Sequence, residues 1–177
     1  MKKVLKRFHE PFTAEIKHPQ TRVIEFIVNE KHKKRGLFDF LSSSPIDFRE
    51  ITISNGSLMI DVKPKMLNPF RGMGKIFMKL EKDDNSSWTK VEGEIVPYNN
   101  RYIITVFLFL SFLTVWTAFA FIIDTSINTF IVVALGWTMF TFILYMLPFW
   151  YRSRLREYKD SLLLILNSKS VKQKRFR

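Results

Sequence analysis

The chain contains no cysteine, and this absence excludes disulfide bonds, thiolate metal ligands and thiol nucleophiles. Its histidines, His9, His18 and His32, lie apart with no second ligand at metal-binding spacing, so we expect no metal site. The sequence also has no P-loop, no HExxH motif and no recognisable set of Ser, His and carboxylate. These absences predict a non-enzymatic protein without a cofactor.

Charge is missing from two long apolar runs. Residues 103–123 hold no ionisable side chain, and residues 127–151 hold none except the phenols of Tyr145 and Tyr151. Each run is long enough to cross a hydrocarbon core of about 30 Å at about 1.5 Å per residue. Because only residues 124–126 separate them, the runs predict an antiparallel transmembrane hairpin. The lack of acids and bases within it argues against an ion-coupled carrier.

The net charge of +12 lies on both sides of this hairpin rather than within it. Arg101 precedes the first run, Arg152 and Arg154 follow the second, and Asp124 occupies the turn. By the positive-inside rule we expect both termini in the cytosol and Asp124 on the opposite side. We expect the basic flanks to contact anionic lipid headgroups in preference to nucleic acid. The lipid bilayer is therefore the first predicted partner.

Residues 1–98 predict a small antiparallel β-rich cytosolic domain with one helix at residues 19–35. Pro19 suits the first helical position, and Val23 and Ile27 recur on one helical face. A strand at residues 23–28 is the competing interpretation. The first eight residues fit a membrane-surface segment, a disordered start or an edge strand, and the sequence does not choose among these.

The clearest β signal is the dipeptide Asn55-Gly56, which tolerates the positive backbone angles of a two-residue hairpin turn. It predicts a hairpin of strands 48–54 and 57–63. Alternating apolar residues predict a second hairpin of strands 75–81 and 88–96. The first turn also sets the register of its hairpin. The residues expected to pair on the core face are Ile51 with Ile60 and Ile53 with Leu58.

Residues 152–177 predict an amphipathic helix followed by a basic end. This helix can lie on the membrane surface, pack on the sheet or pair with another copy, and we favour the sheet because the lead-in from the hairpin is short. The predicted fold class is an α+β membrane protein with a β-rich cytosolic domain, a two-helix transmembrane hairpin and a C-terminal amphipathic helix. The apolar stripe of that helix contains Leu155, Tyr158, Leu162 and Leu166.

Two sets of residues are candidate functional sites. The first is a basic loop in which two glycines expose backbone N–H groups beside cations, a combination suited to an anion, although a turn entering a strand has the same composition. Its members are Lys63, Lys65, Arg71, Gly72, Gly74 and Lys75. The second is a series of hydroxyls that either pack the hairpin or line a pore formed by several copies. Its members are Ser111, Thr114, Thr117, Thr138, Thr141 and Tyr145.

The order of these parts, together with the segment Asn68-Pro69-Phe70-Arg71-Gly72-Met73-Gly74-Lys75-Ile76-Phe77, resembles a family of uncharacterised bacterial two-helix membrane proteins with a cytosolic β-domain. It is more distantly similar to the two-helix β-domain effectors of cyclic-nucleotide antiphage systems, including the Panoptes type. The resemblance implies that the β-domain senses a cyclic dinucleotide. It also implies that the hairpins oligomerise and damage the bacterial inner (plasma) membrane.

The leading hypothesis is a non-enzymatic membrane effector. Its β-domain would bind an anionic ligand of the nucleotide class and control whether the hairpins form a homo-oligomer. The short connection from the last strand to the hairpin and the basic glycine loop motivate it. The alternatives are a structural or accessory subunit whose β-domain docks a partner protein, and a lipid-binding membrane module.

Overall fold

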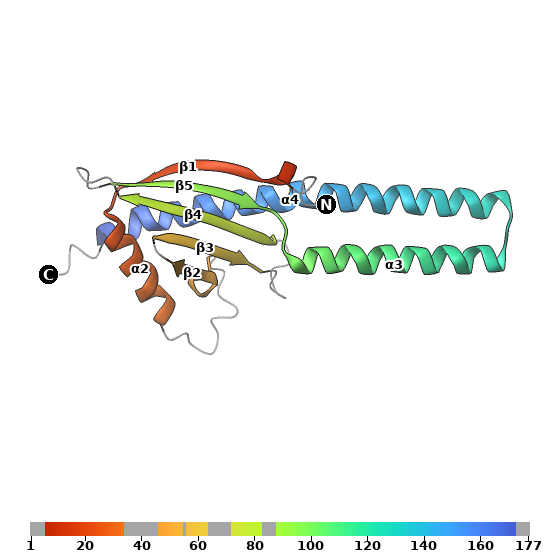
Figure 1. Ribbon diagram of the computed structural model, residues 1–177, viewed down its shortest axis with the longest axis horizontal. Coiled ribbons are helices and arrows are strands. Elements are labelled where there is room, and N and C mark those ends of the chain that lie inside the picture. Colours follow the sequence, from red (N-terminus) through yellow and green to blue (C-terminus); the bar gives the residue numbers. More distant parts are fainter. Residues whose placement is uncertain (1–5, 34–45, 55, 64–71, 83–87, 173–177) are drawn as a thin grey trace.

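The computed structural model describes residues 6–33, 46–54, 56–63, 72–82 and 88–172, which form an α+β fold. A five-stranded antiparallel sheet has the strand order β1-β5-β4-β3-β2, and two long helices form a hairpin that projects from one end of it (Figure 1). The elements are η1 (Lys6–Phe8), β1 (Glu10–Ile16), α2 (Gln20–His32), η3 (Phe48–Glu50), β2 (Ile51–Ser54), β3 (Ser57–Val62), β4 (Gly74–Lys82), β5 (Thr89–Val96), α3 (Asn100–Ile123) and α4 (Ile127–Lys172).

The hairpin of β2 and β3 confirms the predicted turn and register. Gly56 has a φ of +76°, a conformation that glycine adopts without strain, while Asn55 lies outside the described residues. The first strand begins later than the predicted residue 48, because residues 48–50 form the single turn η3. The paired residues are Ile51 with Ile60 and Ile53 with Leu58.

The second hairpin, of β4 and β5, is also confirmed, but β1 was not predicted. β1 pairs with β5 from Glu10 opposite Ile95 to Ile16 opposite Thr89, and it forms one edge of the sheet. Its inward residues alternate with exposed ones, and Ile16 is fully buried. The edge-strand interpretation of the first eight residues is wrong where they are described, because Lys6–Phe8 form η1.

The helix predicted at residues 19–35 is present as α2, and the competing strand is wrong. Pro19 precedes the first turn. The helix ends at His32, earlier than the predicted residue 35, because Lys33 already has a non-helical backbone; residues 34–35 lie outside the described residues. Val23 and Ile27 are buried against the sheet core. Gln20 donates a hydrogen bond to the Leu80 carbonyl, which attaches the start of α2 to β4.

α4 is one continuous helix of 46 residues, and the predicted separate tail helix is its second half. This half runs along one face of the sheet, as Figure 1 shows, and it contacts β1, β4 and β5. The predicted packing of its apolar stripe on the sheet is confirmed. All four residues of the stripe are buried in the core, namely Leu155, Tyr158, Leu162 and Leu166.

α3 and the first half of α4 form the apolar hairpin, which we define as residues 100–151. The structure contains two helices that are long and apolar enough to cross a membrane, with mean hydropathies of 2.4 and 2.2 in their most apolar windows. Most of their side chains face outward, and 6% of each window is buried. A surface this apolar is unfavourable in water and suits a lipid environment.

Candidate functional site

The sheet and the apolar hairpin meet at a junction that the structure builds from four chain segments. We define the junction as residues 6–10 of η1 and β1, residues 72–75 at the start of β4, residues 94–102 between β5 and α3, and residues 144–156 of α4. The strand β5 ends at Val96 and α3 begins at Asn100, so a very short connection joins them. Any movement of the sheet would therefore be transmitted to the apolar hairpin through this junction.

Pro148 interrupts the backbone hydrogen bonds of α4 at the junction. Proline has no N–H, so the carbonyl four residues earlier, that of Leu144, loses its usual helical donor. The hydroxyl of Tyr102, at the start of α3, donates a hydrogen bond to this carbonyl at 3.0 Å. Tyr102 is buried and its ring meets that of Tyr151 edge-on. The two helices of the hairpin are thus tied at the point where α4 is weakest.

The N-terminal turn η1 docks on the apolar end of α4. The ring of Phe8 is buried and packs edge-on against Phe149, with centroids 5.2 Å apart, and against Tyr145. The next strand is held by charge, since the Glu10 carboxylate accepts two hydrogen bonds from Arg156, at 3.0 and 2.7 Å. Arg152 also lies 3.4 Å from Glu10. η1 is therefore attached to the apolar half of α4, and the start of β1 to the half that packs on the sheet.

A second polar cluster joins β1, β5 and the connection to α3. The His9 ring is hydrogen-bonded to the Glu94 carboxylate at 2.8 Å through Nδ1 and to the Tyr98 hydroxyl at 2.5 Å through Nε2. Burial raises the pKa of Tyr98, and the nearby carboxylate of Glu94 raises it further. The phenol therefore stays neutral at physiological pH, and the cluster binds the end of β5 to the N-terminal segment.

The two glycines of the predicted anion loop lie against α4. Gly72 has a φ of +92°, and a Cβ at this position would fall 2.9 Å from Cβ of Arg154. Gly74 has a φ of +152°, and a Cβ there would overlap the Val96 carbonyl oxygen and lie 2.7 Å from Leu155 Cδ1. Glycine is therefore required for close packing here, which the sequence did not reveal.

The structure brings two of the four predicted cations of this loop into one neighbourhood. Lys63 follows β3, and Lys75 in β4 pairs with Asp61, while Lys65 and Arg71 lie outside the described residues. Lys63 Nζ is 3.9 Å from the Asp61 carboxylate. The Asp61 carboxylate reduces the positive potential between the two lysines, so an anion bound here would need both of them.

Within the apolar hairpin, the hydroxyl of Thr117 takes part in helix packing, as one of the two interpretations predicted. The indole N–H of Trp137 donates to Thr117 Oγ1 at 2.9 Å. One residue earlier on each helix, the Trp116 ring covers Gly136, where a Cβ would come within 2.9 Å of it. Leu113 and Val133 are the buried residues at the centre of this contact.

The other predicted hydroxyls point away from the contact between the helices. Ser111, Thr114, Thr138 and Thr141 are exposed, and Tyr145 is 56% exposed. At about 100° per residue these side chains fall to one side of the contact surface on each helix, and in an antiparallel pair the two sides coincide. They therefore form one face of the hairpin, which we call the hydroxyl face. Thr114 and Thr138 donate to carbonyls of their own helices.

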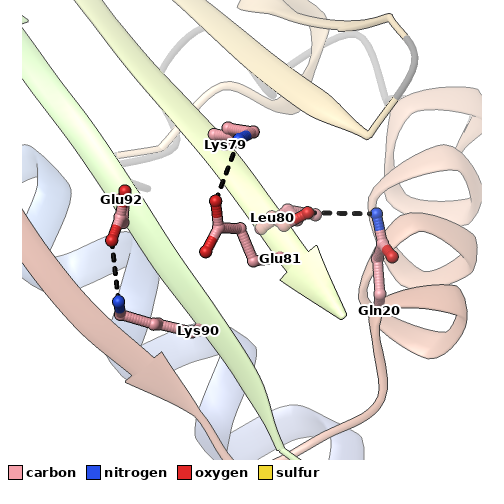
Figure 2. A network of polar contacts seen from close by, with 6 residues as sticks. All are labelled: Gln20, Lys79, Leu80, Glu81, Lys90 and Glu92. Carbon is pink, nitrogen blue, oxygen red and sulfur yellow. Dashed lines mark hydrogen bonds and ion pairs between the residues drawn. The ribbon is translucent and has the colours of Figure 1, made fainter. Parts of the chain in front are cut away.

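The sheet face opposite α4 is charged and open in the described part of the chain. Lys79 pairs with Glu81 and Lys90 with Glu92, at 2.9 and 2.7 Å, as Figure 2 shows. The hydrogen bond within the first pair raises the pKa of Lys79 and lowers that of Glu81. Beside these pairs is a hollow of about 460 Å³ that Met59 and Phe77 line together with several polar residues.

The described residues contain no group of three or more His, Cys, Asp or Glu that could hold a metal ion. Comparisons with protein-family models, with curated proteins and with solved structures found no match to this chain. The geometry of the junction therefore carries the functional argument. Sequence reasoning missed its key residues Phe8, Glu10 and Tyr102, although Pro148 within a predicted helix was a signal that the carbonyl of Leu144 needs another donor.

Proposed function

We propose that the protein is a non-enzymatic integral membrane effector, in which a cytosolic β-domain senses an anionic ligand and sets the oligomeric state of the apolar hairpin. The observation that carries this proposal is the continuity of α4. The same helix provides half of the hairpin and a row of core residues under the sheet. A change in the sheet cannot leave the hairpin unaffected, whereas a simple anchor needs only one crossing and a slack linker.

The proposed location is the bacterial inner membrane, with two crossings and both termini in the cytosol. Basic residues gather where the hairpin meets the sheet, while Asp124 lies in the turn at the far end. This distribution supports the orientation through the positive-inside rule. Ser126 and Thr129 donate hydrogen bonds to the Asp124 carboxylate and lower its pKa, which keeps the turn charged and in water.

We propose that the ligand binds at the basic loop and that it is a nucleotide. The support is positional, because Gly72 and Gly74 at the end of the loop pack directly on Arg154 and Leu155 of α4. An anion that draws Lys63 and Lys75 together would shift the start of β4, and α4 would have to follow. Phosphate oxygens accept charge-assisted hydrogen bonds from lysine ammonium groups.

The hydroxyl face is the proposed surface through which hairpins associate. It carries small and polar side chains, and such residues allow helices in lipid to approach closely and to form hydrogen bonds between them. Large apolar side chains occupy much of the remaining surface. They include Phe112, Phe119, Leu135 and Met139, all exposed.

A titration of the purified full chain with a panel of cyclic mononucleotides and dinucleotides tests this function. We expect one of them to raise the melting temperature and to change the mass of the detergent-solubilised particle in light scattering. The double variant Lys63→Gln/Lys75→Gln should weaken this response at least about tenfold, because two charge-assisted contacts are lost. Lys79→Gln, on the same strand but away from the loop, is the matched control. Absence of any nucleotide response in the wild type would contradict the proposal.

The second candidate function is an accessory subunit that docks a partner protein on the open sheet face. The hollow beside the exposed Phe77 favours it. This function predicts that a native pull-down retains a stable partner, that Phe77→Glu loses this partner, and that overexpression causes no membrane leakage. Leakage on overexpression, with retention of the same partners by Phe77→Glu, would favour the effector.

A further inference from the structure

The N-terminal turn η1 lies at one end of the apolar hairpin. Phe8 packs on Tyr145 and Phe149, which belong to the last two turns of α4 before the first arginine of its basic half, Arg152. Tyr145 and Arg152 are separated by about 10 Å along a helix. If the hairpin crosses a membrane, as the proposed function requires, η1 is held at the depth of the lipid headgroups on the cytosolic side. Aromatic rings are enriched at this depth.

The cations of η1 differ from the arginines of α4 in the junction. Arg152 and Arg156 are paired with Glu10, and Arg154 is paired with Glu157. Lys6 and Arg7 are exposed and have no ion pair among the described residues. The junction thus satisfies three of its cations internally and presents two others beside the apolar surface.

We propose that Lys6 and Arg7 bind the phosphate groups of anionic phospholipids in the cytosolic leaflet. Guanidinium and ammonium groups donate several hydrogen bonds to phosphate, and an anionic leaflet attracts cations within about 10 Å of its surface. Phe8 anchors the backbone of η1 on α4, so the two cations are held close to the membrane surface. Lipid binding then stabilises η1 and the adjoining strand β1 on α4.

The lipid composition of nanodiscs tests this site in the full chain. Wild-type protein is reconstituted in phosphatidylcholine alone and in phosphatidylcholine mixed with phosphatidylglycerol, and its melting temperature is measured in each. We expect phosphatidylglycerol to raise the melting temperature by about 2–4 °C. Lys6→Gln/Arg7→Gln should abolish this increment. Lys79→Gln/Lys90→Gln, which removes the same charge from the open sheet face, should retain it.

The outcomes separate this proposal from the membrane function on which it rests. Failure of the chain to enter nanodiscs at all would overturn both. Entry without a phosphatidylglycerol increment in the wild type, or an unchanged increment in Lys6→Gln/Arg7→Gln, would overturn the lipid site alone. An equal increment from inorganic phosphate in phosphatidylcholine discs would assign the site to a free anion instead. As a second readout, native mass spectrometry should show fewer bound phosphatidylglycerol molecules on this variant and recovery in Lys6→Arg/Arg7→Lys.

Discussion

The hydrogen bond between Tyr102 and the Leu144 carbonyl gives a sharp test of the junction. In Tyr102→Phe this carbonyl loses its side-chain donor, and Pro148 supplies no backbone N–H in its place. An unsatisfied acceptor away from water costs about 1–3 kcal/mol, so we expect the hairpin to be destabilised by about this amount. The measurement is unfolding of the detergent-solubilised full chain by a denaturing detergent, followed by circular dichroism.

The free-energy cost of losing this hydrogen bond can be separated from other effects of the substitution by restoring a donor to the Leu144 carbonyl. Pro148→Ala provides an N–H that bonds the same carbonyl, so in this background Tyr102→Phe should cost only a few tenths of a kcal/mol. Tyr145→Phe, which removes an exposed phenol hydroxyl from α4, is the matched control and should change little. An equal cost of Tyr102→Phe with and without Pro148 would refute the reasoning.

Three further predictions concern packing and charge. Gly74→Ala should lower the free energy of unfolding by about 2–6 kcal/mol, because the new Cβ strains the backbone and overpacks against α4. Gly56→Ala should cost only about 1–3 kcal/mol, because its Cβ meets the flexible end of a side chain. Thermal unfolding measures both changes. Thr117→Val should destabilise the hairpin by about 0.6 kcal/mol because the indole loses its acceptor, and Thr114→Val should cost less, as measured in the same detergent titration. Asp124→Asn should lower the helix stability above about pH 4 and match the wild type at lower pH, since a depressed carboxyl pKa contributes stability that is lost as pH falls through the folded-state pKa. A loss for Asp124→Asn that persists in acid would contradict this last expectation.

The two β-hairpins were predictable because the information that specifies them is local. Asn55-Gly56 fixes a two-residue turn, and the turn fixes which residues face each other across β2 and β3. β1 lacked such a signal. It pairs with β5, which lies far along the chain, and its Pro11 and Glu15 are typical of an edge strand with one exposed side. Non-local pairing of this kind is decided by the assembled sheet and not by the segment itself.

The continuity of α4 was missed for a different reason. The sequence changes from wholly apolar to amphipathic near Arg152, and Pro148 precedes this change, so a boundary was the natural prediction. The helix continues because the hydrogen bond that Pro148 cannot donate to the Leu144 carbonyl is replaced by one from the Tyr102 hydroxyl. Tyr102 lies 42 residues earlier in the chain than Leu144. This hydrogen bond is a tertiary contact, and the helical periodicity of the sequence does not predict it.

The two glycines of the basic loop suit two different roles. A pair of glycines among cations is expected both for an anion cradle and for a strand that begins under a helix, since each requires a backbone without side chains. The structure supplies the neighbours of Gly72 and Gly74, and these explain the glycines by packing alone. Lys63 and Lys75 therefore distinguish a ligand sensor from a purely structural junction, because packing does not require their charges.

The junction also fixes where the sheet and the hairpin can move relative to each other. A regular helix bends least where its backbone hydrogen bonds are complete, and a proline is the usual site of a kink. In α4 that site is Pro148, and Gly72 packs on the helix just beyond it, against Arg154. A ligand that shifts the basic loop would therefore bend α4 about Pro148, and it would have to break or rotate the bond from Tyr102 to Leu144. This hydrogen bond is thus expected to hold the resting state, and its loss should favour the ligand-bound arrangement even without ligand.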